Sequence, residues 1–407
     1  MAGVWSVLLM AGAAYAVHQE RASQIAAIGA IPNLTWTAAP HPRFALHPPG
    51  ASKNLCGVMD GWKERIQARI AAGTIERFVS AENVAVPEEF DSAENWPKCA
   101  KIIGDIRDQS NCGCCWAFAG AEAASDRMCI ATDATLMLPL SAQDVCFCGS
   151  DDGCNGGFVE EPWDYIRLHG AVTGGQYHGT GPFGKGLCAD YSLPHCHHHG
   201  PQGKDPFPAE GEPGCPKADS PKCPASCGAA SSDTHSNFTA DKYSFDGKVV
   251  AASGETDIQR MILAGGPVET AYTVFSDFEN YAGGVYQHVT GEKAGGHAVK
   301  IVGWGVDGGV KYWKIANSWN PYWGEGGYFR ILRGSNHCGI EDQVVATSAD
   351  SKWHPGVTPS YACEDQETEE KCKALSCTWC YFKIFKMGFC KKHDFHCDSE
   401  ALNTLVV

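Results

Sequence analysis

The pattern of apolar and polar residues predicts a helical part followed by a strand-rich part. Residues 116–128 contain no proline and only one glycine, and their alanine-rich run favours a buried helix. Residues 297–304 and 310–315 alternate in the way that is typical of strands entering a sheet. Two further segments extend this division, since residues 161–169 suit a helix and residues 327–333 suit a strand.

Other segments carry signals for a helix start, a charged helix and loops. Ser141, followed three positions later by Asp144, resembles the capped start of a helix. Residues 62–77 are charged and compatible with a helix. Gly, Pro and Ser are concentrated between residues 195 and 236, which predicts long loops there.

The N-terminus and the composition indicate a protein of the secretory pathway. Residues 1–16 are typical of a signal peptide, because an apolar stretch ends in Ala14-Tyr15-Ala16, and no run is long enough to span a bilayer. Twenty-one cysteines among 407 residues imply disulfide bonds. The formal net charge of −15 argues against nucleic-acid binding. Sequons at two positions permit glycosylation, at Asn33 and Asn237.

Cys115 is the first candidate for catalytic chemistry. It stands at the start of the predicted helix, where the helix dipole favours a thiolate over a thiol. Gln109, six positions upstream, can donate a hydrogen bond to an acyl oxygen that becomes negative. Cysteine is also a common core or disulfide residue, so the motif alone leaves a structural role open.

His297 and Asn317 are candidates for a base and its orienting partner. A nucleophilic thiol needs a base that removes its proton and later protonates the leaving amine. His297 opens one predicted strand and Asn317 follows the next, so neighbouring strands can bring the two side by side. Taken singly, His297 could be a core histidine and Asn317 a turn residue. Together with Cys115 they predict a Cys-His-Asn site.

The segment Cys112-Gly113-Cys114-Cys115-Trp116 resembles the active-site signature of the papain family of cysteine peptidases. The resemblance covers about residues 86–347. It implies an α+β, papain-like fold in which the active-site cleft lies between a helical lobe and a β-sheet lobe. Cys114 stands where the signature has Ser or Ala, which leaves the redox behaviour of this segment open.

The same resemblance assigns roles to the candidate residues. Cys115 is the nucleophile, His297 the general acid and base, Asn317 its orienting partner, and Gln109 the oxyanion donor. Trp319 would shield the bond between His297 and Asn317 from water. The chemistry needs no cofactor and no metal, and the substrates would be proteins and peptides.

Several motifs resemble cathepsin B-like members of the family, at residues 106–109, 151–157, 284–291, 332–341 and 194–200. The last motif lies in an expected occluding loop, about residues 188–227, that would cover the primed end of the cleft. By the resemblance, His198 and His199 bind the C-terminal carboxylate of the substrate, which adds peptidyl-dipeptidase to endopeptidase activity. A zinc site is the alternative interpretation of these histidines. An acidic, oxidising compartment disfavours zinc and suits protonated histidine.

The expected attachment of this loop is weak. In cathepsin B-like enzymes two salt bridges hold it, of which one survives here as His198 with Asp108. Tyr322 occupies the position of the acidic partner in the other bridge. One partly exposed bridge is worth about 1 kcal/mol or less. We therefore expect a loosely closed loop and a raised share of endopeptidase activity.

Five disulfide bonds carry over from the resemblance: Cys99–Cys129, Cys112–Cys154, Cys148–Cys223, Cys188–Cys227 and Cys196–Cys215. Cys115 stays free for chemistry. Four more cysteines outside the C-terminal tail have no partner by this alignment, and we expect them to be small buried residues: Cys56, Cys114, Cys146 and Cys338.

The aligned substrate pocket predicts a departure in specificity. Gln343 takes the place of an acidic residue at the back of the subsite for the second residue before the scissile bond. A neutral amide cannot form the charge-assisted pair that selects arginine, so we expect hydrophobic or aromatic residues to be preferred there. The other substrate-binding positions implied are Gly156, Gly157, Phe158, Val159, Ala271, Gly296, Ala298 and Trp319.

The resemblance also suggests how the chain is organised. Residues 17–85 look like a propeptide that lies through the cleft in the non-productive direction and inhibits the enzyme, and we expect residues 62–77 to be an insertion in it. The mature enzyme would comprise residues 86–347. We expect a monomer that is active in a lysosome, an equivalent acidic vacuole or outside the cell. Its other expected partners are inhibitors of the cystatin type.

The tail, residues 348–407, is not explained by the family. Aromatic residues and six cysteines suggest a small disulfide-stapled module, although zinc binding through Cys377 and Cys380 is an alternative. The six cysteines are Cys363, Cys372, Cys377, Cys380, Cys390 and Cys397. For the whole chain two functions stay open, an active cysteine peptidase and a catalytically silent binding protein on a peptidase scaffold.

Overall fold

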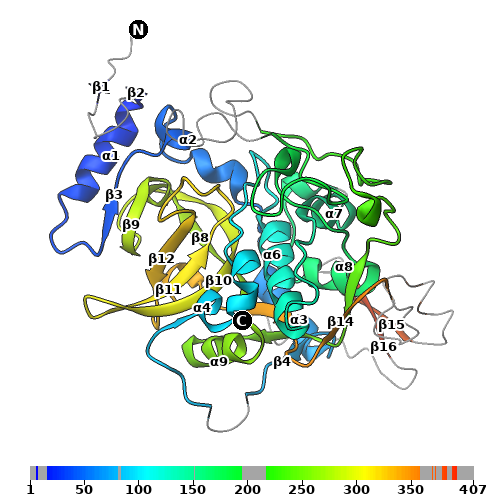
Figure 1. The fold of residues 1–407 in the computed structure, drawn as a ribbon. Coiled ribbons are helices and arrows are strands. Elements are labelled where there is room, and N and C mark those ends of the chain that lie inside the picture. The colour runs from blue at the N-terminus through cyan, green and yellow to red at the C-terminus, as the bar shows by residue number, and fades with distance from the viewer. Residues whose placement is uncertain are drawn as a thin grey trace.

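A helical lobe and a sheet lobe make up most of the structure, a computed structural model (Figure 1). In the helical lobe, α6 (Cys115–Ala131) is central, and in the sheet lobe the longest strand is β10 (Lys293–Asp307), which contacts α6. The predicted α+β, two-lobed fold is thus confirmed. The structure describes residues 6–7, 16–80, 84–150, 152–194, 217–357, 369, 372, 378–382 and 387–391.

The helical lobe forms around α6, in which most side chains are apolar or small and the charged ones, Glu122, Asp126 and Arg127, are buried as well. Every residue of α6 from Cys115 to Cys129 is buried, as expected for a helix in the middle of a core. α7 (Ala142–Cys148) begins at Ser141, whose hydroxyl accepts a hydrogen bond from the Asp144 N–H at 3.1 Å. α8 (Glu161–His169) has the bounds that the sequence predicts. Two short helices precede α6, namely α4 (Ser92–Asn95) and α5 (Ala100–Ile103).

The sheet lobe has the strand order β3-β9-β12-β11-β10-β8-β13-β7-β4, with β5 beside β10. β10 is antiparallel to both of its neighbours, and its register places His297 opposite Tyr272 of β8. α9 (Glu255–Gly265) contacts β7 and β10. The strands are β5 (Phe90–Asp91), β7 (Val249–Ala252), β8 (Val268–Phe275), β9 (Tyr281–Tyr286), β11 (Val310–Ala316), β12 (Tyr328–Leu332) and β13 (Val344–Thr347).

Both edges of this sheet are completed by the N-terminal segment, which we define as residues 16–80. β3 (Trp36–Ala38) is antiparallel to β9 at one edge, and β4 (Glu76–Arg77) is parallel to β7 at the other. The expected helix at residues 62–77 is shorter than predicted, because it ends near Gly73, a residue with a φ of +69°, and continues as β4. The helices of the segment are α1 (Gln19–Gly29), α2 (Pro42–Ala45) and α3 (Trp62–Ala71).

The disulfide pattern corrects one part of the sequence interpretation. Cys114 and Cys146, which we expected to be unpaired, form a disulfide with Cα atoms 6.2 Å apart. The bond is possible because Cys114 caps α6, Cys146 lies on α7, and these two helices pack together. The Cys196–Cys215 pair lies outside the described residues. Four bonds are present as inferred, Cys99–Cys129, Cys112–Cys154, Cys148–Cys223 and Cys188–Cys227.

The C-terminal tail begins on the body of the protein. β14 (Lys352–Pro355) pairs with β6 (Tyr243–Asp246), and β15 (Thr378–Phe382) forms an antiparallel hairpin with β16 (Met387–Lys391). Cys372 is in a disulfide bond, whereas Cys363, Cys377 and Cys397 lie outside the described residues. Near the N-terminus β1 (Ser6–Val7) pairs with β2 (Ala16–Val17). Among the helices described, none has the length and apolar character needed to cross a membrane.

Candidate active site

Cys115 is the first residue of α6 and is fully buried. Burial raises the pKa of its thiol from the ordinary value to about 11, although backbone N–H groups oppose this shift. One of these groups is the Gly57 N–H, which donates to Cys115 Sγ at 3.2 Å. Gly57 belongs to the N-terminal segment, so this segment reaches the sulfur directly. In this state the Cys115 side chain is a neutral thiol at neutral pH.

His297 and Asn317 are held together at the junction of β10 and β11. The Nε2–H of His297 donates to Asn317 Oδ1 at 2.8 Å, and the Ser318 N–H donates to the same oxygen at 2.9 Å. Because an amide oxygen only accepts, the proton of the neutral imidazole lies on Nε2 and Nδ1 keeps its lone pair. Burial lowers the pKa of His297 to about 4, against the effect of the Asn317 hydrogen bond.

Aromatic rings cover the bond between His297 and Asn317. Trp319 is fully buried and its ring centroid lies 5.0 Å from that of His297. Phe278 packs against the same tryptophan from the sheet lobe at 5.6 Å, and Phe44 packs against it from the N-terminal segment at 5.4 Å. The rings exclude water and so strengthen the hydrogen bond that they surround.

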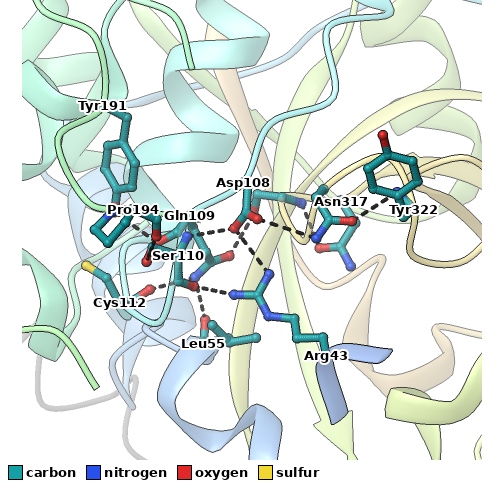
Figure 2. Close-up of polar contacts among 12 residues, drawn as sticks. Arg43, Leu55, Asp108, Gln109, Ser110, Cys112, Tyr191, Pro194, Asn317 and Tyr322 are labelled. Carbon is teal, nitrogen blue, oxygen red and sulfur yellow. Dashed lines mark hydrogen bonds and ion pairs between the residues drawn. The ribbon is translucent and has the colours of Figure 1, made fainter. Parts of the chain in front are cut away.

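Gln109 is also buried and its amide is held at both ends (Figure 2). Its Oε1 accepts from the Ser318 hydroxyl at 2.7 Å. Its Nε2 donates to the carbonyl oxygens of Cys112 at 2.8 Å and Leu55 at 3.0 Å. The carbonyl of Leu55, a residue of the N-terminal segment, therefore takes a hydrogen bond that an acyl oxygen of a substrate could receive.

The N-terminal segment passes between the two lobes at residues 55–59 and forms backbone hydrogen bonds to both. Gly157 of the helical lobe donates its N–H to Gly57 O at 2.9 Å and accepts from the Met59 N–H at 3.1 Å. On the other side, the Val58 N–H donates to Gly296 O at 3.0 Å. Gly57 also passes so close to Gly113 that an added Cβ would lie 1.7 Å from the Gly113 oxygen. Residues 55–59 thus fill the space next to Cys115.

Comparison with known proteins identifies the family. A family model described as papain family cysteine protease matches residues 86–348. The chain belongs to the papain family of cysteine proteases. The cathepsin B-like cysteine proteinases 4 and 5 of Caenorhabditis elegans are 46% and 44% identical to it over 264 and 277 residues. These matches cover 64% and 66% of this chain and 74% and 76% of the two relatives. The predicted cathepsin B-like resemblance is confirmed.

Solved structures show a likeness over a larger share of the chain. The proCathepsin B S9 of Trypanosoma congolense is 30% identical, with a TM-score of 0.64, and the match covers 80% of this chain and 97% of that one. A procathepsin L 3 from the larval midgut of Tenebrio molitor, 20% identical with a TM-score of 0.54, shares the fold. Both of these structures are proforms.

The predicted subsite of the protease lies beside residues 55–59. Val159, Ala271 and Ala298 are fully buried, and Gln343 is 7% exposed. Phe158 is partly exposed, and the guanidinium of Arg65 lies over its ring at 4.2 Å. Gly156 has a φ of +118°, and a Cβ there would lie 2.7 Å from Gly57 O, so a side chain at this position would push the segment away.

Asp108 has a partner that the sequence analysis did not foresee. Its Oδ1 pairs with Arg43 Nη1 of the N-terminal segment at 3.1 Å, and both side chains are buried (Figure 2). Arg43 also donates to Ser110 O. The expected partner of Asp108, His198, lies outside the described residues, as does His199. The Tyr322 N–H donates to Asn320 Oδ1 at 2.9 Å.

The ion pair of Arg21 is a second contact that the sequence did not predict. Its side chain is fully buried and pairs with the fully buried Glu279 of the sheet lobe, Nη2 to Oε2, at 2.6 Å. The remaining N–H groups donate to Asn280 Oδ1 at 2.9 Å, His47 O at 3.0 Å and Pro48 O at 2.9 Å. Opposite charges were visible in the sequence, but nothing in it indicated that these two would meet.

Proposed function

We propose that this protease is made as an inactive precursor in which residues 17–85 block a Cys115–His297–Asn317 site. The main support is that Gln109, Cys115, Gly157 and Gly296 all bind the same short stretch of backbone, residues 55–59. The reaction would be hydrolysis of peptide bonds in proteins and peptides, as a cysteine endopeptidase.

The geometry suggests how each group would act. His297 Nδ1, which keeps its lone pair in the neutral ring, would accept the proton of Cys115. The thiolate would then attack the substrate carbonyl carbon, and Gln109 Nε2 would stabilise the negative oxygen. The imidazolium would return the proton to the leaving amine. Water, deprotonated by His297, would hydrolyse the thioester, and Cys115 would leave as the thiol.

The contacts of the N-terminal segment explain why it would inhibit and not be cleaved. Cys115 Sγ accepts a hydrogen bond from the Gly57 N–H. The carbonyl that Gln109 holds belongs to Leu55, two residues earlier. Attack needs the sulfur and the oxyanion donor on the same carbonyl group. Residues 55–57 separate these two contacts, which supports a non-productive binding mode.

Further properties follow from the cathepsin B-like relationship. His198 and His199 would bind the C-terminal carboxylate of a substrate and add peptidyl-dipeptidase activity. Asn33 and Asn237 are exposed, as glycosylation requires. We expect secretion or delivery to an acidic compartment, inhibition by proteins of the cystatin type, and a preference for hydrophobic residues at the Gln343 subsite.

The experiment is to express the full chain, process it at acidic pH and label it with a thiol-directed epoxide probe. Labelling at Cys115, cleavage of a short fluorogenic dipeptide substrate, and loss of both in a Cys115→Ala variant would support the proposal. Labelling without cleavage, or neither after complete processing, would favour a catalytically silent scaffold instead.

A further inference from the structure

Helix α3 of the N-terminal segment rests on carboxylates of the protease domain. Its residue Arg69 forms a two-pronged pair with Asp164 of α8, in which Nη2 lies 3.0 Å from Oδ1 and Nη1 contacts Oδ2. Arg65 contacts Glu160, and its Nη2 lies 3.3 Å from Glu161 Oε1. Paired guanidinium and carboxylate groups of this kind are the strong charge-assisted type.

A third basic residue of α3 contacts a carboxylate next to the predicted subsite. Lys63 Nζ contacts Asp342, the residue directly before Gln343. Three basic side chains of one helix thus meet four acidic groups of the protease domain. We call these four residues the acidic surface: Glu160, Glu161, Asp164 and Asp342.

Two observations indicate that the acidic surface binds positive charge, which the basic side chains of α3 supply in this structure. Glu160 is fully buried beneath α3, and its Oε2 has no hydrogen-bond partner among the described residues. Burial alone would lower the pKa of Arg69, yet this pKa is raised because Asp164 lies against the guanidinium. Ile66, which lies between Arg65 and Arg69 in the sequence, is fully buried and adds apolar packing. When α3 departs, the acidic surface loses these cations.

The acidic surface adjoins the place where a substrate would lie. The guanidinium of Arg65 stacks on Phe158 at 4.2 Å, and Phe158 belongs to the predicted subsite. Resting on the proposed function, we propose that the acidic surface of the mature enzyme binds basic residues of the substrate that precede the one held by Phe158 and Gln343. The enzyme would then favour basic segments upstream of a hydrophobic residue.

The test uses the processed full-length product and two internally quenched peptides. Both carry Phe as the second residue before the scissile bond, and one has two arginines upstream where the other has two glutamates. At low ionic strength kcat/KM should be about fivefold higher for the arginine peptide, a value typical of two partly exposed ion pairs. The preference should shrink in 1 M salt, because salt screens exposed charges.

Variants locate the effect. Asp164→Asn and Asp342→Asn should each reduce the preference for the arginine peptide. Asp133→Asn is the control, because it removes an equal charge from a pair with Lys98 at 2.7 Å elsewhere on the protein, and it should leave this preference unchanged. Each kcat/KM is divided by that of the same variant on a short dipeptide substrate. No cleavage of the short substrate would refute the proposed function itself. Cleavage of it with equal rates for the two long peptides would overturn only this inference, and would mean that Arg167 or solvent neutralises the surface.

Discussion

The buried pair of Arg21 and Glu279 makes a sharp prediction about the stability of the proform. Arg21→Ala removes the cation but leaves the Glu279 carboxylate buried at the junction with the N-terminal segment. Part of its hydrogen bonding remains, because Glu279 Oε1 still accepts from the Ser52 N–H at 2.6 Å and the Gly50 N–H at 3.1 Å. The charge itself is no longer compensated.

The expected magnitude follows from the burial of both partners. Removing one member of a buried ion pair costs about 3 to 5 kcal/mol, and the surviving N–H donors favour the lower end. A loss of about 3 kcal/mol in docking free energy raises the undocked fraction of the N-terminal segment about 100-fold. Arg21→Lys keeps the charge, but a lysine cannot reach all four acceptors of Arg21, which are on Glu279, Asn280, His47 and Pro48. Its loss of docking free energy should therefore be intermediate.

The assay is the rate at which an epoxide probe labels Cys115 in the unprocessed proform at neutral pH. Since residues 55–59 cover the sulfur, labelling should report the undocked fraction. Arg21→Ala should label about 100-fold faster than the wild type. Arg77→Ala is the matched control, because Arg77 is exposed and contacts only Gln67 among the described polar partners, at 3.0 Å. Equal labelling rates for the two variants would refute this account of docking.

Three further predictions concern the cleft. Gln343→Glu should shift the kcat/KM ratio toward Arg over Phe in dipeptide substrates by about tenfold or more, and a clear Arg preference of the wild type would contradict the subsite assignment. Gly57→Ala should speed epoxide labelling of the proform, because its Cβ would lie 1.7 Å from Gly113 O. The equilibrium constant for docking of the N-terminal segment should fall about tenfold per pH unit as pH falls from 6.5 toward 4. Hydrogen exchange of the β3 amides in a Cys115→Ser proform, corrected for intrinsic exchange rates, measures this constant. The variant His297→Gln should make its pH dependence flatter.

Local sequence signals predicted the elements that carry the site. The bounds of α8 agree residue for residue, and α6 and β10 contain the segments expected from residues 116–128 and 297–304. Such segments have long apolar runs or a regular apolar period, which are signals within the segment itself. The hydrogen bond between His297 and Asn317 needed only that two successive strands be neighbours, as is common in sheets.

Such local sequence signals could not predict the contacts of the N-terminal segment. Arg43 meets Asp108 across 65 positions, and Arg21 meets Glu279 across 258. A sequence with 32 basic and 47 acidic residues allows a very large number of pairings, and only the docked backbone selects among them. β4 has two residues, too few for any periodic pattern. Its place at the sheet edge depends on the preceding helix α3 and not on its own composition.

The Cys114–Cys146 bond shows a different limit of prediction from sequence, which concerns disulfide pairing. We carried pairings over from enzymes with Ser or Ala at the position of Cys114, so the alignment offered no partner for it. Sequence alone does not fix disulfide connectivity. The packing of α7 against α6 brings the two Cα atoms to 6.2 Å and thereby supplies the missing information. Because Cys112 and Cys114 are both bonded, the free thiol among residues 112–115 is that of Cys115.

The docked structure also sets the charge states of Cys115 and His297. Burial lowers the pKa of His297 to about 4 and raises that of Cys115 to about 11. Between these values the docked pair is neutral. Below pH 6.5 the undocked imidazole binds a proton that the docked one does not, so stability of the docked state is lost as pH falls toward 4. The same proton creates the imidazolium that stabilises a thiolate. We therefore expect acid to favour both undocking of the N-terminal segment and formation of the Cys115 thiolate, in each case through protonation of His297.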